Sequence, residues 1–368
     1  MTRTPPALRA DTVRSLAARW LSRFGDGDFV VSPAGLWLAL GAVAAGARGR
    51  TAGELRELLG VGGEAAAGAV TGAARRLAGT DGLAVGTGVW ARAAVREEFR
   101  RSLPDVRFGG LGGDAQGALD AWVREATGGR IDGSPLALDG SEELVLLNAL
   151  ALKASWATAF ARDLTRDEPF TDGDGRTRPV PTMRRRIPPS SVRSVGGVTV
   201  VELPCAGEGA ALVRFALGPE GAGPGEVLPA AWAGPGEGEP LAADAADLLL
   251  PRFTLRTRTE ANEHLAALGV ERALRPGADF SGLSAEDLFV DKVVQEAMVE
   301  VAEEGVEAAA VTQVRMARSA APPRREVVRR IAFDRPFGVV VLDAEGEVPL
   351  FAGWRRSAPS VGGRGVSR

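Results

Sequence analysis

The sequence predicts an α+β protein in which helices come first and antiparallel or mixed β-sheets follow. Helical patterns fill the chain up to about residue 140, and long runs rich in Val and Leu occupy much of the rest. The two kinds of element do not alternate in the βαβ manner that a parallel sheet requires. With 368 residues, 45% of them hydrophobic and 25% charged, the chain can bury a large core. No linker is long enough to divide it, so we expect a single domain over residues 1–368.

Two helix signals stand out in the first part of the chain. Ser32 is a capping residue, Pro33 suits the first helical position, and the apolar run after them predicts a buried helix. Thr51 and Glu54 then form a capping-box pattern, with leucines on one face and Gly60 as the C-cap. We therefore expect one helix from Pro33 and a second one from Thr51 to Gly60.

Strand signals dominate the later part. Residues 337–354 contain two apolar runs around an Ala-Glu-Gly turn, which indicates a hairpin. Residues 218–240 are rich in Gly and Pro and are predicted to form a surface loop. Further strands, rich in Val and Leu, are predicted at 143–153, 197–204, 209–217, 247–257 and 288–301.

One segment, "EEGVEAAAVTQVRMARSAAPP" (303–323), carries both strand and loop signals. From Val306 to Arg318 the even positions are mostly apolar and the odd ones mixed to polar, as in a half-buried strand. These thirteen residues at ~3.3 Å each would span roughly 43 Å, whereas a usual strand has about 5–6 residues. Gly305 and the Pro322-Pro323 pair nevertheless isolate the segment as a loop.

Charge and composition favour a protein of the cytoplasm. The net charge of −3 gives no basic field for nucleic acid, and no apolar run approaches the ~20 residues of a membrane span. Residues 1–24 are Arg-rich, lack the apolar region of a secretory signal, and read as a helix. Cys205 is the only cysteine, so no internal disulfide can form. A mature extracellular chain would look the same, and this alternative stays open.

The recognisable chemistry of enzymes is missing. His264 is the only histidine and lies in a helical pattern, so we interpret it as a helix-face residue rather than a catalytic base. One His and one Cys exclude the usual zinc sites, and the glycine-rich stretches at 109–113 and 218–238 do not lie between a strand and a helix. The basic runs at 184–186 and 324–330 have no interleaved aromatic residues and are interpreted as solvated faces. We predict no enzyme activity, no metal, no cofactor and no nucleic-acid partner.

Several motifs, in order over most of the chain, resemble the serpins, the large serine-protease inhibitors. They are "VVSPAGLWLALGAVAAGARGRTAGELRELLG" (30–60), "LVLLNALALKASWATAF" (144–160), "TRDEPFTDGDGRTRPVPTM" (165–183), "VVELPCAGEGAALVRFALGPEG" (200–221), "LLLPRFTLRTRTEANEHLAALGV" (248–270), "GADFSGLSAEDLFVDKVVQEAMVEVAEEGVEAAA" (277–310) and "FDRPFGVVVLDAEGEVPLFAGW" (333–354).

The resemblance implies the serpin fold: three β-sheets including a large central sheet A, eight or nine helices, and an exposed reactive-centre loop. That loop would cover about residues 303–325, and a poorly ordered tail would cover about 357–368. In the family mechanism, a protease attacks the loop and forms an acyl-enzyme through its own serine. The cut loop then inserts as an extra strand into sheet A and drags the protease with it, which distorts the protease active site.

The resemblance also places the hinge of the loop. Insertion needs flexibility and small side chains, which Gly305 and the following alanines supply. Family inhibitors usually have Thr or Ser at the position of Val306, and we expect the valine to slow insertion at most. The hinge residues are Glu303, Glu304, Gly305, Val306, Glu307, Ala308, Ala309 and Ala310.

Under sheet A the family has a polar cluster, the shutter, which holds two strands together until they part. Ser32, Asn148 and Gln295 match three of its positions, although Gln295 replaces a usual His and Gly35 a usual Ser. Trp156 matches the tryptophan of the breach at the top of the sheet, where insertion begins. Ordinary core packing is the alternative interpretation for each of these residues.

The position of the cleaved bond follows from the family's usual loop length. Counting from Glu303, the specificity residue is Ser319 with cleavage before Ala320, which favours elastase-like or subtilisin-like proteases. The alternative is a trypsin-type bond between Arg318 and Ser319, because a guanidinium suits an acidic specificity pocket. Arg315 is a third candidate, and the register favours Ser319.

The preferred hypothesis is therefore a monomeric suicide inhibitor of serine proteases, with cysteine proteases as a further option. A non-inhibitory serpin that acts as a binding or storage protein is the alternative, favoured if Val306 and the altered polar cluster block insertion. A hydrolase that uses His264 is the third hypothesis and has the least support.

Overall fold

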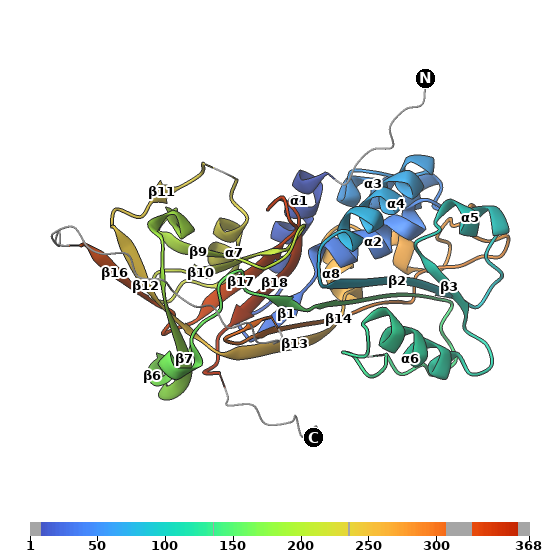
Figure 1. Cartoon of the computed structure of the whole chain (residues 1–368). Helices are drawn as coiled ribbons and strands as arrows, with labels where there is room; N and C mark the ends of the chain where they lie inside the picture. Colours follow the sequence, from blue (N-terminus) through green and yellow to red (C-terminus); the bar gives the residue numbers. More distant parts are fainter. Residues whose placement is uncertain (1–8, 135, 235, 307–325, 360–368) are drawn as a thin grey trace.

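The computed structural model describes residues 9–134, 136–234, 236–306 and 326–359. In these ranges, eight α-helices and three short 3₁₀ helices surround sheets of seven, five and four strands, with a further two-stranded pair (Figure 1). The prediction of an α+β fold with mixed sheets is confirmed. No helix in the described ranges is long and apolar enough to cross a membrane.

Most helices precede the long strands, as the sequence predicts, but the part of the chain predicted to be helical also contains three strands, of which β2 (Leu83–Ala91) has nine residues. Figure 1 shows α2, α3 and α4 gathered on one side of the five-stranded sheet and α6 on the other. The helices are α1 (Ala10–Leu21), α2 (Pro33–Ala44), α3 (Gly49–Leu59), α4 (Glu64–Ala78), α5 (Glu97–Ser102), α6 (Ala115–Ala126), α7 (Pro224–Ala231) and α8 (Asn262–Ala267).

The seven-stranded sheet is antiparallel throughout. In spatial order its strands are β1 (Phe29–Val31), β18 (Pro349–Arg355), β17 (Phe337–Leu342), β10 (Leu212–Leu217), β9 (Val198–Pro204), β8 (Val192–Val195) and β11 (Glu239–Pro240). The predicted hairpin is confirmed by β17 and β18, which are drawn in red near the middle of Figure 1.

The other two large sheets flank this one. The four-stranded sheet has the order β16 (Val328–Ala332), β12 (Ala245–Pro251), β7 (Thr177–Ile187) and β6 (Arg166–Thr171). The five-stranded sheet has the order β13 (Phe253–Glu260), β14 (Lys292–Val301), β4 (Leu144–Leu152), β2 (Leu83–Ala91) and β3 (Arg107–Gly110). We identify the five-stranded sheet with the expected central sheet A because it holds both β4 and β14, although the seven-stranded sheet is larger.

The helix predictions are confirmed except for one cap. Ser32 caps α2 and its Oγ accepts the N–H of Gly35 at 3.0 Å, while Gly60 ends α3 with φ of 70°. The prediction of a capping box at Thr51 and Glu54 was wrong, because α3 already begins at Gly49 and Thr51 lies inside the helix. The Thr51 hydroxyl instead accepts the N–H of Asp279 at 2.9 Å, so this side chain fixes a distant loop rather than the helix end.

Two predictions in the later part of the chain were also wrong. The strand expected over 247–257 is two strands in two different sheets, β12 and β13. The ladder stops at Pro251, which has no N–H to donate, and Arg252 instead donates its N–H to the Pro181 carbonyl at 2.9 Å. The loop expected over 218–240 contains α7, which begins with Pro224.

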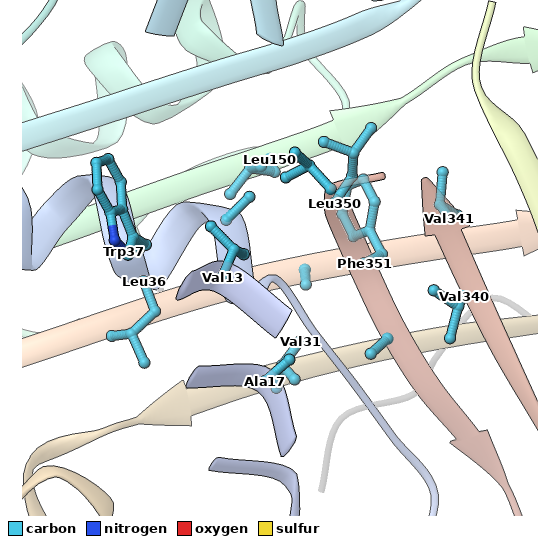
Figure 2. Close-up of a cluster of buried hydrophobic side chains, with 14 of the residues drawn as sticks. Val13, Ala17, Val31, Leu36, Trp37, Leu150, Val340, Val341, Leu350 and Phe351 are labelled. Carbon is cyan, nitrogen blue, oxygen red and sulfur yellow. The ribbon is translucent and has the colours of Figure 1, made fainter. Parts of the chain in front are cut away.

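The hydrophobic core lies on both faces of β4, which is why that strand reads as a continuous apolar run. Leu144, Leu146 and Leu150 belong to the cluster packed under α2, whereas Val145 and Leu147 belong to the cluster under α6. Figure 2 shows part of the first cluster, to which α1, α2, β1, β4 and the hairpin contribute side chains. Those labelled are Val13, Ala17, Val31, Leu36, Trp37, Leu150, Val340, Val341, Leu350 and Phe351.

The start of the expected C-terminal tail contacts the body of the protein. Ser357 donates its N–H to Asp28 at 2.9 Å, and the Ala358 carbonyl accepts a hydrogen bond from Arg355 at 3.1 Å. Residues 360–368 of that tail lie outside the described residues.

Candidate functional site

The centre of the five-stranded sheet is a seam between two parallel strands, β4 and β14. Their pairing runs from Lys292 opposite Val145 to Met298 opposite Ala151. The outer neighbours, β2 and β13, are antiparallel to β4 and β14. A chain that leaves β14 and turns back would be antiparallel to both strands of the seam. Its entry would therefore replace one parallel ladder with two antiparallel ones, which are somewhat more stable per residue.

The three residues that the sequence places in the shutter, Ser32, Asn148 and Gln295, meet in one buried cluster at the seam. Each is at most 2% exposed. The Ser32 N–H donates to Gln295 Oε1 at 2.6 Å, and Gln295 Nε2 donates to the Ser32 carbonyl at 2.9 Å and to Asn148 Oδ1 at 3.4 Å. Asn148 Nδ2 donates to the Gly86 carbonyl at 3.1 Å and to Thr87 Oγ1 at 3.2 Å. Because buried amides must be paired, this chain of bonds ties the start of α2 to β14, β4 and β2.

Gly35 makes room for the amide of Asn148. A Cβ atom at position 35 would lie 1.9 Å from Asn148 Oδ1 and 2.5 Å from Leu150 Cδ1. Any larger residue would force Asn148 to move, so the glycine and the present position of the amide go together.

The chain that leaves β14 folds back at once. Ala302 and Gly305 exchange two backbone hydrogen bonds, of 3.0 and 3.3 Å, and close a tight turn. Gly305 and Val306 form β15, which pairs antiparallel with β5 (Ala154–Ser155). Gly305 has φ of 150°, and a Cβ there would lie 2.2 Å from the Ala154 carbonyl oxygen. This glycine therefore permits a close backbone contact, in addition to any role as a hinge.

The segment of residues 154–165, which we call the strap, crosses the base of the loop. Trp156 Nε1 donates to the Ala302 carbonyl at 2.9 Å, and the Trp156 N–H donates to the Glu304 carbonyl at 3.0 Å. The Phe160 N–H donates to the Glu303 carbonyl at 2.8 Å. Trp156 is 4% exposed and packs edge-on against Phe160, with the ring centroids 6.4 Å apart. The tryptophan predicted for the breach therefore contacts the loop base through both its backbone and its indole.

Two glutamates at the loop base are held by side chains that sequence reasoning did not single out. Glu303 is 6% exposed, accepts a hydrogen bond from Thr165 Oγ1 at 2.8 Å, and forms an ion pair with Arg252 Nε at 3.4 Å. Glu304 is paired with Arg162. A buried carboxylate requires such partners. The sequence alone does not identify these partners, because 44 basic residues are spread along the chain. All of them except Lys153 and Lys292 are arginine.

The other predicted loop residues lie outside the described residues. They are Glu307, Ala308, Ala309 and Ala310 of the hinge, and Arg318, Ser319 and Ala320 of the reactive bond. Their assignments stay predictions.

The single histidine and the single cysteine are held in place by packing and hydrogen bonding with neighbouring residues. His264 lies on α8, as predicted, and its Nδ1 accepts a hydrogen bond from Trp20 Nε1 at 3.0 Å, while burial lowers the pKa of the imidazole. Cys205 is 6% exposed, and burial raises the pKa of its thiol to about 12. Within the described residues, no group of three or more His, Cys, Asp or Glu side chains is arranged to hold a metal ion.

Comparisons with known proteins agree with this geometry. The sequence profile of a family described as "Serpin (serine protease inhibitor)" matches residues 10–357. The chain is 31% identical over 287 residues to the leukocyte elastase inhibitor of Bos taurus, a match that covers 73% of this chain and 72% of the relative.

Solved structures show the same fold. The native state of the thermophilic serpin tengpin matches with a TM-score of 0.81 at 21% identity and covers 95% of this chain and 94% of that one. Human thyroxine-binding globulin, in complex with thyroxine, matches with a TM-score of 0.77 at 22% identity and covers 95% of this chain and 97% of that one. With the family match over nearly its whole length, a relative above 30% identity, and the parallel seam beside the loop base, the chain belongs to the serpin family.

Proposed function

We propose that this chain inhibits serine proteases as a suicide substrate, by inserting its cleaved reactive-centre loop between β4 and β14. The protease would supply the catalytic serine, and the inhibitor would supply the free energy of completing a sheet. The proposed inhibitor acts as a monomer and without a cofactor.

The observation that carries the proposal is the register of β15. Gly305 lies opposite Ser155 and Val306 opposite Ala154, and β5 continues the line of β4 beyond Lys153. The first two residues of a returning strand are thus already paired in the direction that insertion requires. Continued down β4, the same register would bring Thr312 opposite Asn148.

This register also gives a reason for the alternation in the loop sequence. Residues directly opposite one another in a ladder point to the same side of the sheet. The even loop positions, from Val306 to Met316, would lie opposite the even positions of β4, which face the core under α2. The apolar set would therefore be buried by insertion, and Thr312 would arrive at the polar cluster of Asn148 and Gln295.

The target protease follows from the cleaved bond. We propose cleavage between Ser319 and Ala320 by an elastase-like or subtilisin-like enzyme, with Arg318–Ser319 and a trypsin-like enzyme as the alternative. The bovine relative's name supports the elastase-like class. Cysteine proteases remain a further candidate class.

The test is to mix the protein with an elastase-like, a subtilisin-like and a trypsin-like protease in turn. We expect a covalent complex that survives denaturant with at least one of them, and the mass of the released C-terminal peptide identifies the bond. Cleavage of the loop by all three without any complex would contradict inhibition.

Replacing Val306 with Arg provides a control on the mechanism. A long cation cannot be buried between two strands without a large desolvation cost, so Val306→Arg should be cut normally but trap no protease. The measurement is the ratio of complex to cleaved inhibitor on a denaturing gel. If this variant traps protease as well as the parent does, residue 306 is not part of the inserted strand.

A non-inhibitory serpin is the second candidate. Val306, Gln295 and Gly35 all depart from the pattern of family inhibitors, and the chain shares its fold with a thyroxine-binding globulin. For this function, loop cleavage should leave the thermal stability unchanged, because no strand would be added to the sheet.

A further inference from the structure

Three consecutive arginines near the end of β7 look equivalent in the sequence, but the structure separates them. Arg184 and Arg186 lie on the outer face of the four-stranded sheet, where both are exposed. Arg184 donates two hydrogen bonds to Asp247, of 2.9 and 2.6 Å, and Arg186 pairs with Glu326. The interpretation of this run as a solvated face is confirmed for these two residues.

Arg185 points the other way, toward the strap. One of its guanidinium nitrogens donates to the Thr158 carbonyl, and its Cζ lies 4.8 Å from the centroid of the Phe160 ring. In the described part of the chain it has no carboxylate within ion-pair distance. Burial lowers the pKa of Arg185 to about 10, so the side chain stays charged at neutral pH. A partly desolvated cation over an aromatic face is a stronger contact than an exposed one.

The aromatic ring covered by Arg185 belongs to Phe160, one of the residues that bind the base of the loop. Phe160 is 3% exposed, and it packs between Arg185 and Trp156. Its backbone N–H holds the Glu303 carbonyl, while the Trp156 N–H holds the Glu304 carbonyl. The stack therefore connects the four-stranded sheet to the turn that sets the register of β15.

We infer that Arg185 is a positioning residue for loop insertion: it clamps the strap onto the loop base and so keeps the first two pairs of the inserted strand formed before cleavage. The inference rests on the proposed function. Loss of the clamp would make insertion start from an unformed end and therefore proceed more slowly. More acyl-enzyme would then be hydrolysed before the protease is trapped.

The experiment compares Arg185→Met with Arg186→Met, which removes the same charge one residue away, and with Arg185→Lys, which keeps a cation. Two quantities are measured for each folded variant. The first is hydrogen exchange at the Trp156 and Phe160 amides, and the second is the number of inhibitor molecules consumed per protease molecule trapped.

We expect Arg185→Met to speed exchange at both amides roughly tenfold, as loss of one cation–π contact and one charged hydrogen bond implies. It should also at least double the inhibitor consumed per protease trapped. Arg186→Met should change neither quantity, and Arg185→Lys should restore much of both, because the ammonium can still reach the Thr158 carbonyl. A purely structural role would lower the unfolding temperature but leave the consumption ratio unchanged.

Equal consumption ratios for Arg185→Met and Arg186→Met, with complexes still formed, would overturn this inference and leave the proposed inhibition intact. Unchanged exchange at Trp156 and Phe160 would overturn it as well. If the parent protein forms no complex with any protease, the proposed function fails and the insertion role of Arg185 fails with it.

Discussion

At the scale of single residues, space around the polar cluster is as important as its hydrogen bonds. Asn148 can lie between β2 and Gln295 only because position 35 has no side chain. In close-packed interiors, an added methyl group forces its neighbours off their preferred positions.

Replacing Gly35 with Ala should therefore lower the free energy of unfolding by about 1–3 kcal/mol, because the new Cβ would overlap Asn148 Oδ1. Gly53→Ala is the matched control, since Gly53 lies in α3 with no atom within 4 Å of its would-be Cβ. The control should gain about 0.5–1 kcal/mol from helix propensity. Urea unfolding measures both, and a stable Gly35→Ala variant would show that Asn148 can relocate without loss.

Cys205 offers a second prediction at this scale. Its raised pKa, about 12, means that the thiol of the folded protein is almost entirely protonated near pH 8, where a free cysteine is partly ionised. Iodoacetamide should label Cys205 far more slowly in the folded protein than in urea, where it should react like a free thiol. Rapid labelling of the folded protein would show that the region around Cys205, whose backbone forms an isolated antiparallel β-bridge with Trp156, opens readily.

At the scale of elements, the seam is held by backbone pairing of β4 with β14, from Val145 to Ala151, and by the side chain of Gln295 at its centre. Gln295 bonds both to the start of α2 and to Asn148 of β4. Its loss would leave the Ser32 N–H and the Asn148 Oδ1 without these partners in a buried site, and unpaired buried groups are costly.

We expect Gln295→Leu to reduce the free energy of unfolding by roughly 2–4 kcal/mol for that reason. Gln295→His, which keeps one donor and one acceptor, should lose less. The comparison is made by urea unfolding of the two variants beside the parent. If leucine and histidine cost the same, hydrogen bonding by residue 295 is not what matters at the seam.

How far the sequence determines these elements depends on whether their signals are local. The cap at Ser32, the buried run of β4 and the hairpin of β17 and β18 are encoded by neighbouring residues and were predicted correctly. The capping box failed because Thr51 bonds to Asp279, and the strand over 247–257 failed because the chain changes sheets at Arg252.

The site divides in the same way. Ser32, Asn148, Gln295 and Trp156 could be named because a family resemblance fixes their positions. Thr165, Arg252, Arg162 and Arg185 could not, because each acts through a partner far away in the sequence and arginine is abundant everywhere. The use of Gly305 as a close backbone contact also appears only in three dimensions.

At the scale of the whole molecule, the fold is one strand short of an antiparallel arrangement on both sides of the seam. The loop base already points along the missing path. If the cleaved loop inserts as proposed, the uncleaved native state is held by a kinetic barrier rather than by the lowest free energy.

Cleavage of the loop should therefore raise the thermal unfolding midpoint, because two antiparallel ladders and buried apolar side chains are gained. Differential scanning calorimetry before and after limited proteolysis measures the change, and Val306→Arg provides the control in which no rise is expected. An unchanged midpoint in the cleaved parent would show that its loop stays outside the sheet.

The order of strands in the seven-stranded sheet has a consequence for synthesis. β17 and β18 follow every other described strand in the sequence, yet they lie between β1 and β10, so this sheet cannot close until both have been synthesised. The strands of the five-stranded sheet, and the loop proposed to insert into it, are synthesised earlier. During that interval the seam and the loop proposed to enter it would both be present without a closed seven-stranded sheet beside them. A pause in synthesis before residue 337 would therefore favour insertion of the uncut loop, which would leave a chain unable to carry out the proposed inhibition.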